Sequence, residues 1–367
     1  MTGWRGTAGR RWRGARTGSG AAVDRRRPSG PTPDGAASLR VESLRAEPRL
    51  AAWVDGLADF ATGVEVALPA DDDLVAALLD LAVPHEDFNE LVATRAGLLA
   101  DPELRALFEQ AVRALVAGIG TVEQHLEVPP LPAASGPVGR WFHVYVFIAA
   151  RPFVLAYHRS LGIPADVSRR TLADLGRHLA VHRRRRGTGG LLALHWPKLH
   201  FRGELYQLGR LQFQRSSVLE RAATSAAEQG LAYRPQDPAL ALHIPDFHGP
   251  LTPAACDESL RLAGEFFPRH FPTERYRLAV CGSWLLDPQL GEYLPEHSNI
   301  IRFQRRFHLD TESSERTCDD TAAIGFVFGD PDLPAESLPR DTTLQRAIGD
   351  HLRAGRHWHV RTGWFEL

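Results

Sequence analysis

The first half of the chain repeats apolar residues with helical spacing. Leu50, Trp53 and Leu57 recur three or four positions apart, which places them on one face of a helix. Asp101, followed by a proline, has the residue types that begin a helix, with the acid as N-cap and the proline in the first turn. Patterns of this kind predict an all-helical region over residues 44–186.

Two long helices are predicted to complete this half. Residues 138–161 are apolar on nearly all sides, as expected of a helix buried at the centre of a domain. The sequence Pro-Ala-Asp at Pro164 suits a first helical turn, and the helix it begins is predicted to reach about His182. The Pro-rich segment 128–137 is predicted to be a loop.

From about Arg183 onward the pattern is mixed. Arg183 to Arg186 and the glycines after them predict a basic, glycine-rich turn. Strands and helices are then predicted to alternate. They comprise a hairpin at 205–208 and 210–213, a helix or loop at 217–229, a strand at 239–244, a helix at 252–267 and a strand at 276–281.

The C-terminal part continues this alternation, with a helix at 298–306, an apolar strand at 322–328, a helix at 341–352 and a closing strand at 357–365. The predicted fold class is therefore α+β, a helical N-terminal domain followed by a mixed α/β C-terminal domain. The expected boundaries are a disordered Arg/Gly-rich arm over 1–40, a helical domain over 41–190 and the mixed domain over 191–367.

Charge is unevenly distributed along the chain. The formal net charge is −1, yet residues 1–40 contain nine Arg against two Asp, so the rest of the chain is acidic. The arm has almost no apolar residues and is predicted to be disordered, either as a basic arm or as an unselected extension. An acidic body argues against a nucleic-acid groove as the main function.

The number of cysteines and the length of the apolar segments indicate in which cellular compartment the protein is expected. Three well-separated thiols, Cys256, Cys281 and Cys318, form neither a disulfide framework nor a zinc signature, so no metal is predicted and a reducing cytoplasm is expected. The N-terminus lacks the apolar core of a signal peptide. The most apolar run, residues 144–150, is too short to cross a bilayer, so no membrane contact is expected.

The predicted strand at 239–244, helix at 252–267 and strand at 276–281 form a strand–helix–strand unit. Reactive side chains lie where its two strands end. His243 closes the first strand, and Cys281 and Ser283 follow the second. A histidine suits proton transfer near neutral pH, and a thiol or hydroxyl beside it is either a nucleophile, a proton donor or a packing group. His243, Cys281 and Ser283 are the candidate catalytic residues.

Three residues beyond Ser283 complete the candidate site. Trp284 packs in the core or forms the wall of an acyl or pantetheine tunnel, and Asp287 starts a turn or binds substrate. Arg302, on the helix that Ser298 is predicted to cap, is a candidate for binding the phosphates of a CoA-like ligand.

Several motifs resemble a known bacterial family. They are Leu-Tyr-x-Leu-Gly-Arg-Leu-Gln-Phe from Leu205, Leu-His-Ile-Pro from Leu242, Pro-Leu-Thr-Pro from Pro250, Cys-x-Ser-Trp-Leu-Leu-Asp-Pro from Cys281, Leu-Pro at Leu294, Ser-Asn-Ile at Ser298 and Phe-Gln-x-x-Phe from Phe303. Together they are similar to acyltransferase-domain proteins that join a helical N-acyltransferase N-terminal domain to a GNAT-like C-terminal domain. The resemblance covers roughly residues 45–367.

The resemblance implies transfer of an acyl group from acyl-CoA, as co-substrate, to a small-molecule amine, with no tightly bound cofactor. It also implies a phosphate-binding turn of the pattern Arg/Gln-x-x-Gly-x-Gly, which Arg184, Gly187 and Gly189 match. Such a turn should follow a strand, whereas a helix is predicted before Arg184. A flexible linker is the alternative for these residues.

Two other functions stay open at this point. One is a catalytically inactive GNAT-like binding or regulatory protein. The other is a hydrolase with Cys281 or Ser283 as nucleophile, aided by His243 or His297 and by Asp287. The sequence does not indicate the oligomeric state, the acceptor or the length of the acyl chain.

Overall fold

The computed structural model describes residues 40–122, 126–132, 135–191, 193–246, 248–309 and 318–367. These residues belong to one compact unit that spans residues 37–367. The predicted disordered arm lies outside the described residues, apart from Arg40.

The N-terminal half is helical, as its periodicity predicts. Its helices are α1 (Val41–Leu44), α2 (Pro48–Leu57), α3 (Asp71–Asp80), α4 (Phe88–Ala100), α5 (Pro102–Ala117), α6 (Gly136–Ser160), α7 (Ala165–Leu172), α8 (Asp174–Arg186) and α9 (His195–Phe201), with short 3₁₀ turns at Ala58–Phe60 and His85–Asp87. Asp101 caps α5 as expected, because its side chain accepts hydrogen bonds from the backbone N–H groups of Glu103 and Leu104.

Two predictions for this half were wrong in detail. The single helix expected from Pro164 to His182 is two helices, α7 and α8, which meet at Ala173. The basic turn expected at Arg183 is instead the last turn of α8, which ends at Gly187 with a left-handed φ of 70°. Four arginines in that turn complement the negative end of the helix dipole, which explains why the helix continues through them.

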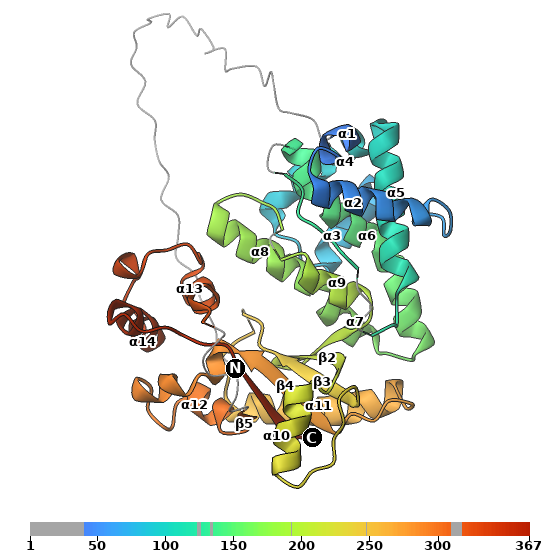
Figure 1. The fold of residues 1–367 in the computed structure, drawn as a ribbon. Coiled ribbons are helices and arrows are strands. Elements are labelled where there is room, and N and C mark those ends of the chain that lie inside the picture. Colours follow the sequence, from blue (N-terminus) through green and yellow to red (C-terminus); the bar gives the residue numbers. More distant parts are fainter. Residues whose placement is uncertain (1–39, 123–125, 133–134, 192, 247, 310–317) are drawn as a thin grey trace, which may run out of the picture. The chain divides into compact units, whose positions relative to one another are not determined.

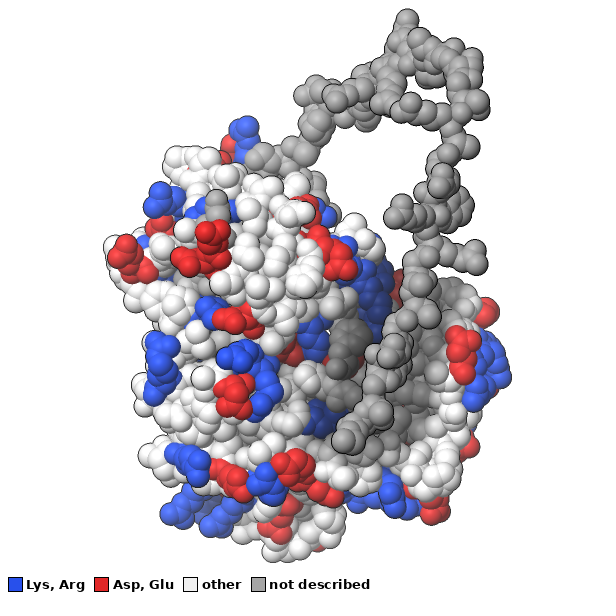
Figure 2. Space-filling model, turned by 180° about the vertical axis from the view of Figure 1, so that it is seen from behind, with Lys and Arg blue, Asp and Glu red and all other residues white. Residues whose placement is uncertain are grey.

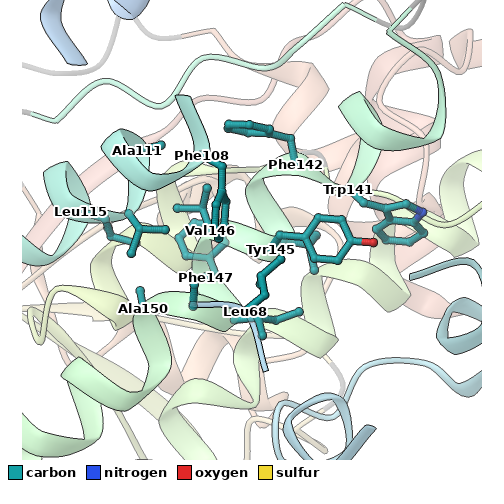
Figure 3. Packing of buried hydrophobic residues seen from close by; sticks show 14 of the residues in the cluster. Leu68, Phe108, Ala111, Leu115, Trp141, Phe142, Tyr145, Val146, Phe147 and Ala150 are labelled. Carbon is teal, nitrogen blue, oxygen red and sulfur yellow. The ribbon is translucent and has the colours of Figure 1, made fainter. Parts of the chain in front are cut away.

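The core of this half forms around α6. Figure 3 shows Phe142, Val146 and Phe147 of α6 packed toward Phe108 and neighbouring residues of α5. Because α6 is buried on most of its circumference, it acts as the central helix that its all-round apolar sequence predicts.

The C-terminal half contains a six-stranded sheet in the order β1-β2-β3-β4-β6-β5. The strands are β1 (Leu205–Leu208), β2 (Leu211–Ser217), β3 (Pro238–His243), β4 (Leu278–Ser283), β5 (His308–Leu309) and β6 (Arg361–Glu366). Only β3 and β4 pair in parallel; the other neighbours are antiparallel. The fold is α+β, as predicted.

The expected strand–helix–strand unit is β3, α11 (Pro253–His270) and β4. Thr252 caps α11 by accepting from the backbone N–H of Ala255. Ser259 of α11 accepts from the backbone N–H groups of Arg210 and Leu211, which fixes the helix against the β1–β2 hairpin. Gly209, in that hairpin, has a φ of 69°, and a Cβ there would lie 2.8 Å from the Ser259 hydroxyl.

The remaining helices are α10 (Glu220–Glu228), α12 (Asn299–Gln304), α13 (Asp320–Phe328) and α14 (Thr343–Arg353). The apolar strand expected at 322–328 is wrong, because this segment is α13. A short apolar run fits a buried strand and a buried helix equally well. Its flanks decide: Asp319 accepts from the backbone N–H of Ala322, and Gly329 ends the helix with a φ of 87°.

In Figure 1, α7, α8 and α9 lie between the other N-terminal helices and the sheet. Direct contacts support this placement. The backbone N–H of Gln207 in β1 donates to the Thr171 hydroxyl of α7 at 3.1 Å, and the Gln212 amide of β2 donates to the Asp174 carboxylate of α8 at 2.8 Å. Thus helices of the first half pack against the sheet of the second.

The surface carries both signs of charge. On the face drawn in Figure 2, acidic and basic side chains are interspersed rather than gathered in a basic stripe. No described helix is long and apolar enough to cross a membrane.

Buried histidines make the stability of the fold dependent on pH. Burial lowers the pKa of His143 from 6.5 to about 4, against the opposing effect of its hydrogen bond to the Pro129 carbonyl. Between pH 6.5 and 4, His143 is therefore protonated in the unfolded chain but neutral in the folded chain. We therefore expect the free energy of unfolding to decrease as the pH is lowered through this window, by up to roughly 1.4 kcal/mol per pH unit for each such histidine.

Urea unfolding of the wild type and of His143→Gln at several pH values will check this. Glutamine still donates to Pro129 but does not titrate, so the variant should have a shallower pH dependence. His297→Gln, at an exposed position, is the control. Equal slopes in all three proteins would contradict the prediction.

Candidate functional site

The candidate site lies where the parallel strands β3 and β4 separate. Their pairing runs from Ala239 with Leu278 to Ala241 with Val280 and stops there, although β3 continues to His243. Beyond that point β3 pairs only with β2, and β4 pairs only with β6. The facing backbone groups of the two strand ends are thus left without each other as partners.

A cavity of about 380 Å³ opens at this separation. Its walls come from the ends of β3 and β4, from β2, and from helices α8, α9 and α13. They include Arg177, His178, Arg185, Trp196, Gln212, Leu242, His243, Asp246, Cys281, Gly282, Ser283, Trp284, Gly325 and Phe326. Gly282 leaves open space where a side chain would be, so a ligand can approach the backbone of β4 there.

His243 lies on this wall in a form that suits a proton acceptor. Its Nε2 lies 2.9 Å from the Gln214 amide oxygen, which only accepts hydrogen bonds, so we assign the ring proton to Nε2. Nδ1 is then unprotonated. Burial lowers the pKa of His243 to about 4, helped by the charges of His200 and His195, so the ring is neutral at physiological pH. The Trp196 ring meets it edge-on, with the centroids 4.7 Å apart.

A second histidine, His178 of α8, faces the same cavity. Its Nε2 lies 2.8 Å from Arg177 Nη2 and 3.1 Å from an Asp174 oxygen. Nε2 thus lies between a guanidinium, which only donates, and a carboxylate, which only accepts. Burial lowers the pKa of His178 to about 4, so the ring is neutral at physiological pH.

Asp174 organises this side of the cavity. It accepts from Arg177 through both oxygens, at 2.6 and 3.1 Å, and from Gln212 at 2.8 Å. Burial opposes its ionisation, but His200, His178 and Arg177 hold its pKa well below the usual range. Arg177 also donates to Asp246 at 2.7 Å.

Cys281 and Ser283 reach the cavity as predicted but lack the partners of a nucleophile. Burial raises the pKa of Cys281 to about 12. The Ser283 hydroxyl accepts from the backbone N–H of Leu285 at 3.1 Å. Among the described residues no hydrogen bond joins either group to a histidine, so the geometry does not favour a hydrolase.

Trp284 and Asp287 have different positions. Trp284 lines the cavity and meets Phe326 of α13 edge-on, at 5.8 Å between centroids. Asp287 is fully buried away from the cavity, where its carboxylate accepts from the backbone N–H groups of Gln289 and His359. This arrangement supports the turn that was predicted for Asp287 and gives its proposed contact with substrate no surface.

The residues predicted to bind CoA phosphates do not line this cavity. Gly187 ends a helix, where carbonyl groups rather than N–H groups are exposed, and Gly189 is packed so that a Cβ would lie 2.2 Å from Asp87. Arg184 contacts Asp246 at 3.5 Å, and Arg302 is exposed on α12. The role of Arg184, Gly187 and Gly189 toward phosphate stays a prediction that the geometry does not favour, and that of Arg302 stays a prediction.

Two further features lie outside the cavity. A second cavity of about 600 Å³ lies within the helical half, beside the start of α6 and the end of α8. The ligand atoms of Cys318, Asp320 and His357 lie within 4.8 Å of one another, although no metal was predicted. Asp320 accepts from His357 and from the backbone N–H of Trp358.

The sequence pattern found the strand ends but missed the helix that faces them. Arg177, His178, Arg185 and Trp196 were not predicted, since nothing in the chain order shows that α8 and α9 cover β3. One local signal was available: Asp174 and His178 are four residues apart, so they share a helix face.

Comparisons with known proteins agree with this architecture. An N-acyltransferase N-terminal domain matches residues 72–203, and a GNAT-like C-terminal domain matches residues 205–365. No curated protein matches the chain. The matches confirm the resemblance that the sequence motifs indicate.

Solved structures are similar to the whole described unit. A Trp-to-Ala mutant of an acyltransferase in complex with octanoyl-CoA has 40% identity and a TM-score of 0.81, covering 90% of this chain and 100% of its own. An acyltransferase in complex with decanoyl-CoA and teicoplanin has the same values, as does one in complex with CoA and 10C-teicoplanin.

The high pKa of Cys281 predicts slow alkylation. With iodoacetamide at pH 7.5, the exposed Cys318 should react first and Cys281 should stay unmodified over the same period. Peptide mass spectrometry will locate the labels, and Cys318→Ser is the control for assignment. Rapid modification of Cys281 would contradict this prediction and would favour the hydrolase hypothesis.

Proposed function

Because the chain belongs to the family that joins an N-acyltransferase N-terminal domain to a GNAT-like C-terminal domain, we propose that it transfers an acyl group from acyl-CoA to an amine. The observation that carries this proposal is the separation of β3 and β4 above a cavity that contains a neutral histidine.

The separated strand ends suit the pantetheine arm of CoA. Leu242 and His243 face Cys281 and Gly282 without pairing. Unpaired N–H and C=O groups at a sheet opening bind an extended ligand through main-chain hydrogen bonds, as an added strand does. The two amides of pantetheine would take this place, which leads the thioester into the cavity.

The phosphates of CoA would lie at the start of α11. The N-terminus of this helix is electropositive, and arginines stand close to it. Arg306 contacts the Pro253 carbonyl and Asp257, and both Arg306 and Arg210 are near enough to act on the thiol of Cys256. Arg302 lies on α12, and Arg306 follows the end of this helix, so Arg302 would approach this end of CoA and not the cavity.

Acyl transfer then needs only proton movement at the cavity. The amine nitrogen attacks the thioester carbon, a C–N bond forms and the C–S bond breaks. His243 Nδ1 takes the proton that the amine loses, and CoA leaves as a thiolate that is protonated to the free thiol. The hydroxyl of Ser283, which lines the cavity, would donate to the oxygen that becomes negative.

The wall of the cavity indicates the class of acyl chain. Trp284, Leu285 and Phe326 give it an apolar side. The related structures hold octanoyl-CoA and decanoyl-CoA, and one holds teicoplanin. We therefore propose a medium-length acyl group and, as acceptor, an amine on a glycopeptide. The cytoplasm, where acyl-CoA is made, is the proposed location.

Substitution of His243 tests the function directly. With decanoyl-CoA and teicoplanin stripped of its acyl chain, the wild type should give the acylated product by mass spectrometry. His243→Ala should lower kcat roughly 10²- to 10⁴-fold, the usual contribution of a general base, with little change in the KM for decanoyl-CoA. His248→Ala, at an exposed histidine nearby, is the matched control.

Two outcomes would count against the proposal. The absence of product, together with no calorimetric heat on titration with decanoyl-CoA or octanoyl-CoA, would exclude the acyltransferase. Full activity of His243→Ala would leave the function standing and remove His243 as its base.

The dependence of kcat/KM on pH should follow the pKa of the acceptor amine rather than that of a group of the enzyme. His243 is neutral above a pKa of about 4, so its own titration does not limit the rate at neutral pH. The amine must be unprotonated to attack. We expect kcat/KM for the acceptor to rise with pH until the amine's own pKa, and to shift when an acceptor with a less basic amine is used. An inflection near pH 6.5 that does not move with the acceptor would contradict this.

A further inference from the structure

The two arginines on the cavity wall differ in their acidic partners. Arg177 is held by two carboxylates, Asp174 and Asp246, and Asp246 also contacts Arg184. Arg185, the other arginine on the wall, forms no ion pair with any described residue; Asp246 and Asp330 act on it only from a distance. Within the described part of the chain, the wall therefore has one arginine without an acidic partner.

Arg185 is held in place although it lacks an acid. Its Nη2 donates to the Gly325 carbonyl of α13 at 2.9 Å, and its Nε is buried without a hydrogen-bond partner. Burial also lowers the pKa of Arg185, which shows that its charge is partly desolvated. A fixed guanidinium of this kind is ready to bind an anion, and its planar fork matches the two oxygens of a carboxylate.

Strand β3 indicates which substrate meets Arg185. Side chains alternate along a strand, so Leu242 and His243 lie on opposite faces of the sheet. Leu242 packs in the core cluster of α11, whereas Gln212, which pairs with His243, donates to Asp174 of α8. Arg185 is on α8, so it faces the His243 side of the sheet. The proposed place of the CoA phosphates, at the start of α11, is on the other side.

We propose that Arg185 binds a carboxylate of the acyl acceptor, so that the preferred acceptor is an amine that also carries a free carboxylate. This inference rests on the proposed function. A single unpaired guanidinium balances a monoanion, which favours a carboxylate over a phosphate dianion. Arg185 acts in specificity, and the transfer of the acyl group itself does not involve it.

Kinetics with a matched pair of acceptors tests this. The pair is teicoplanin stripped of its acyl chain, as the free acid and as its C-terminal amide, with decanoyl-CoA as donor. The wild type should show a KM roughly 10- to 100-fold lower for the acid, as expected of charge-assisted hydrogen bonds. Arg185→Gln should remove this preference, and its KM for decanoyl-CoA should not change. Arg185→Lys, with the charge but not the fork, should fall between.

The controls separate this inference from the function on which it rests. Arg170→Gln, at an exposed arginine paired with Asp166 on α7, should behave like the wild type. Equal KM values for acid and amide in the wild type, with transfer intact, would overturn the inference alone, and this comparison holds even if Arg185→Gln fails to fold. A preference that persists in a folded Arg185→Gln would also overturn it. No transfer to either acceptor would overturn the proposed function and this inference together.

Discussion

The buried carboxylate of Asp174 is the interaction on which the candidate site depends. It is bound by Arg177 of its own helix and by Gln212 of β2, so it joins the helical half to the sheet. Removing one partner of a buried ion pair commonly costs about 3–5 kcal/mol, because the other charge is left uncompensated. Without this tie α8 would lose its hydrogen bond to β2, although Arg177 and Arg185 would still hold it to Asp246 and Gly325.

The same tie determines the chemistry of the cavity. By bringing α8 and α9 over β3, it removes water from His243 and His178, and burial is the largest cause of the low pKa of each. Two neutral histidines result. An amide oxygen leaves His243 with a free Nδ1, while His178 belongs to the polar network of Asp174 and Arg177.

Features of this structure that depend on neighbouring residues can be predicted from the sequence, whereas features that depend on distant residues cannot. Caps and periodicity are local, so the helices of the first half and the unit of β3, α11 and β4 follow from the residues. The expected strand at 322–328 failed because its apolar run lacks a period, although Asp319 and Gly329 at its ends indicate a helix. His243 and Cys281 line one cavity because parallel neighbours end at the same edge of the sheet, a rule that needs no coordinates.

Long-range contacts account for what was missed. Arg185 and Trp196 gain their importance only from elements that lie far from them in the chain, and no periodicity reports that. The formal match at Arg184 and Gly187 shows the converse. Its spacing fits a phosphate turn, but a helix precedes it and ends there, so the exposed groups have the wrong polarity.

The division into two halves has a physical reason in this arrangement. A sheet whose central strands part exposes unpaired backbone groups, which is unfavourable unless another element covers them or a ligand pairs with them. The helical half covers them only in part, with polar and apolar groups on different walls of the cavity. The sheet thus provides the opening, and the helices determine what can enter it. An apolar wall at Trp284 and Phe326 next to an arginine without an acidic partner, Arg185, would suit a ligand with both an apolar and an anionic part.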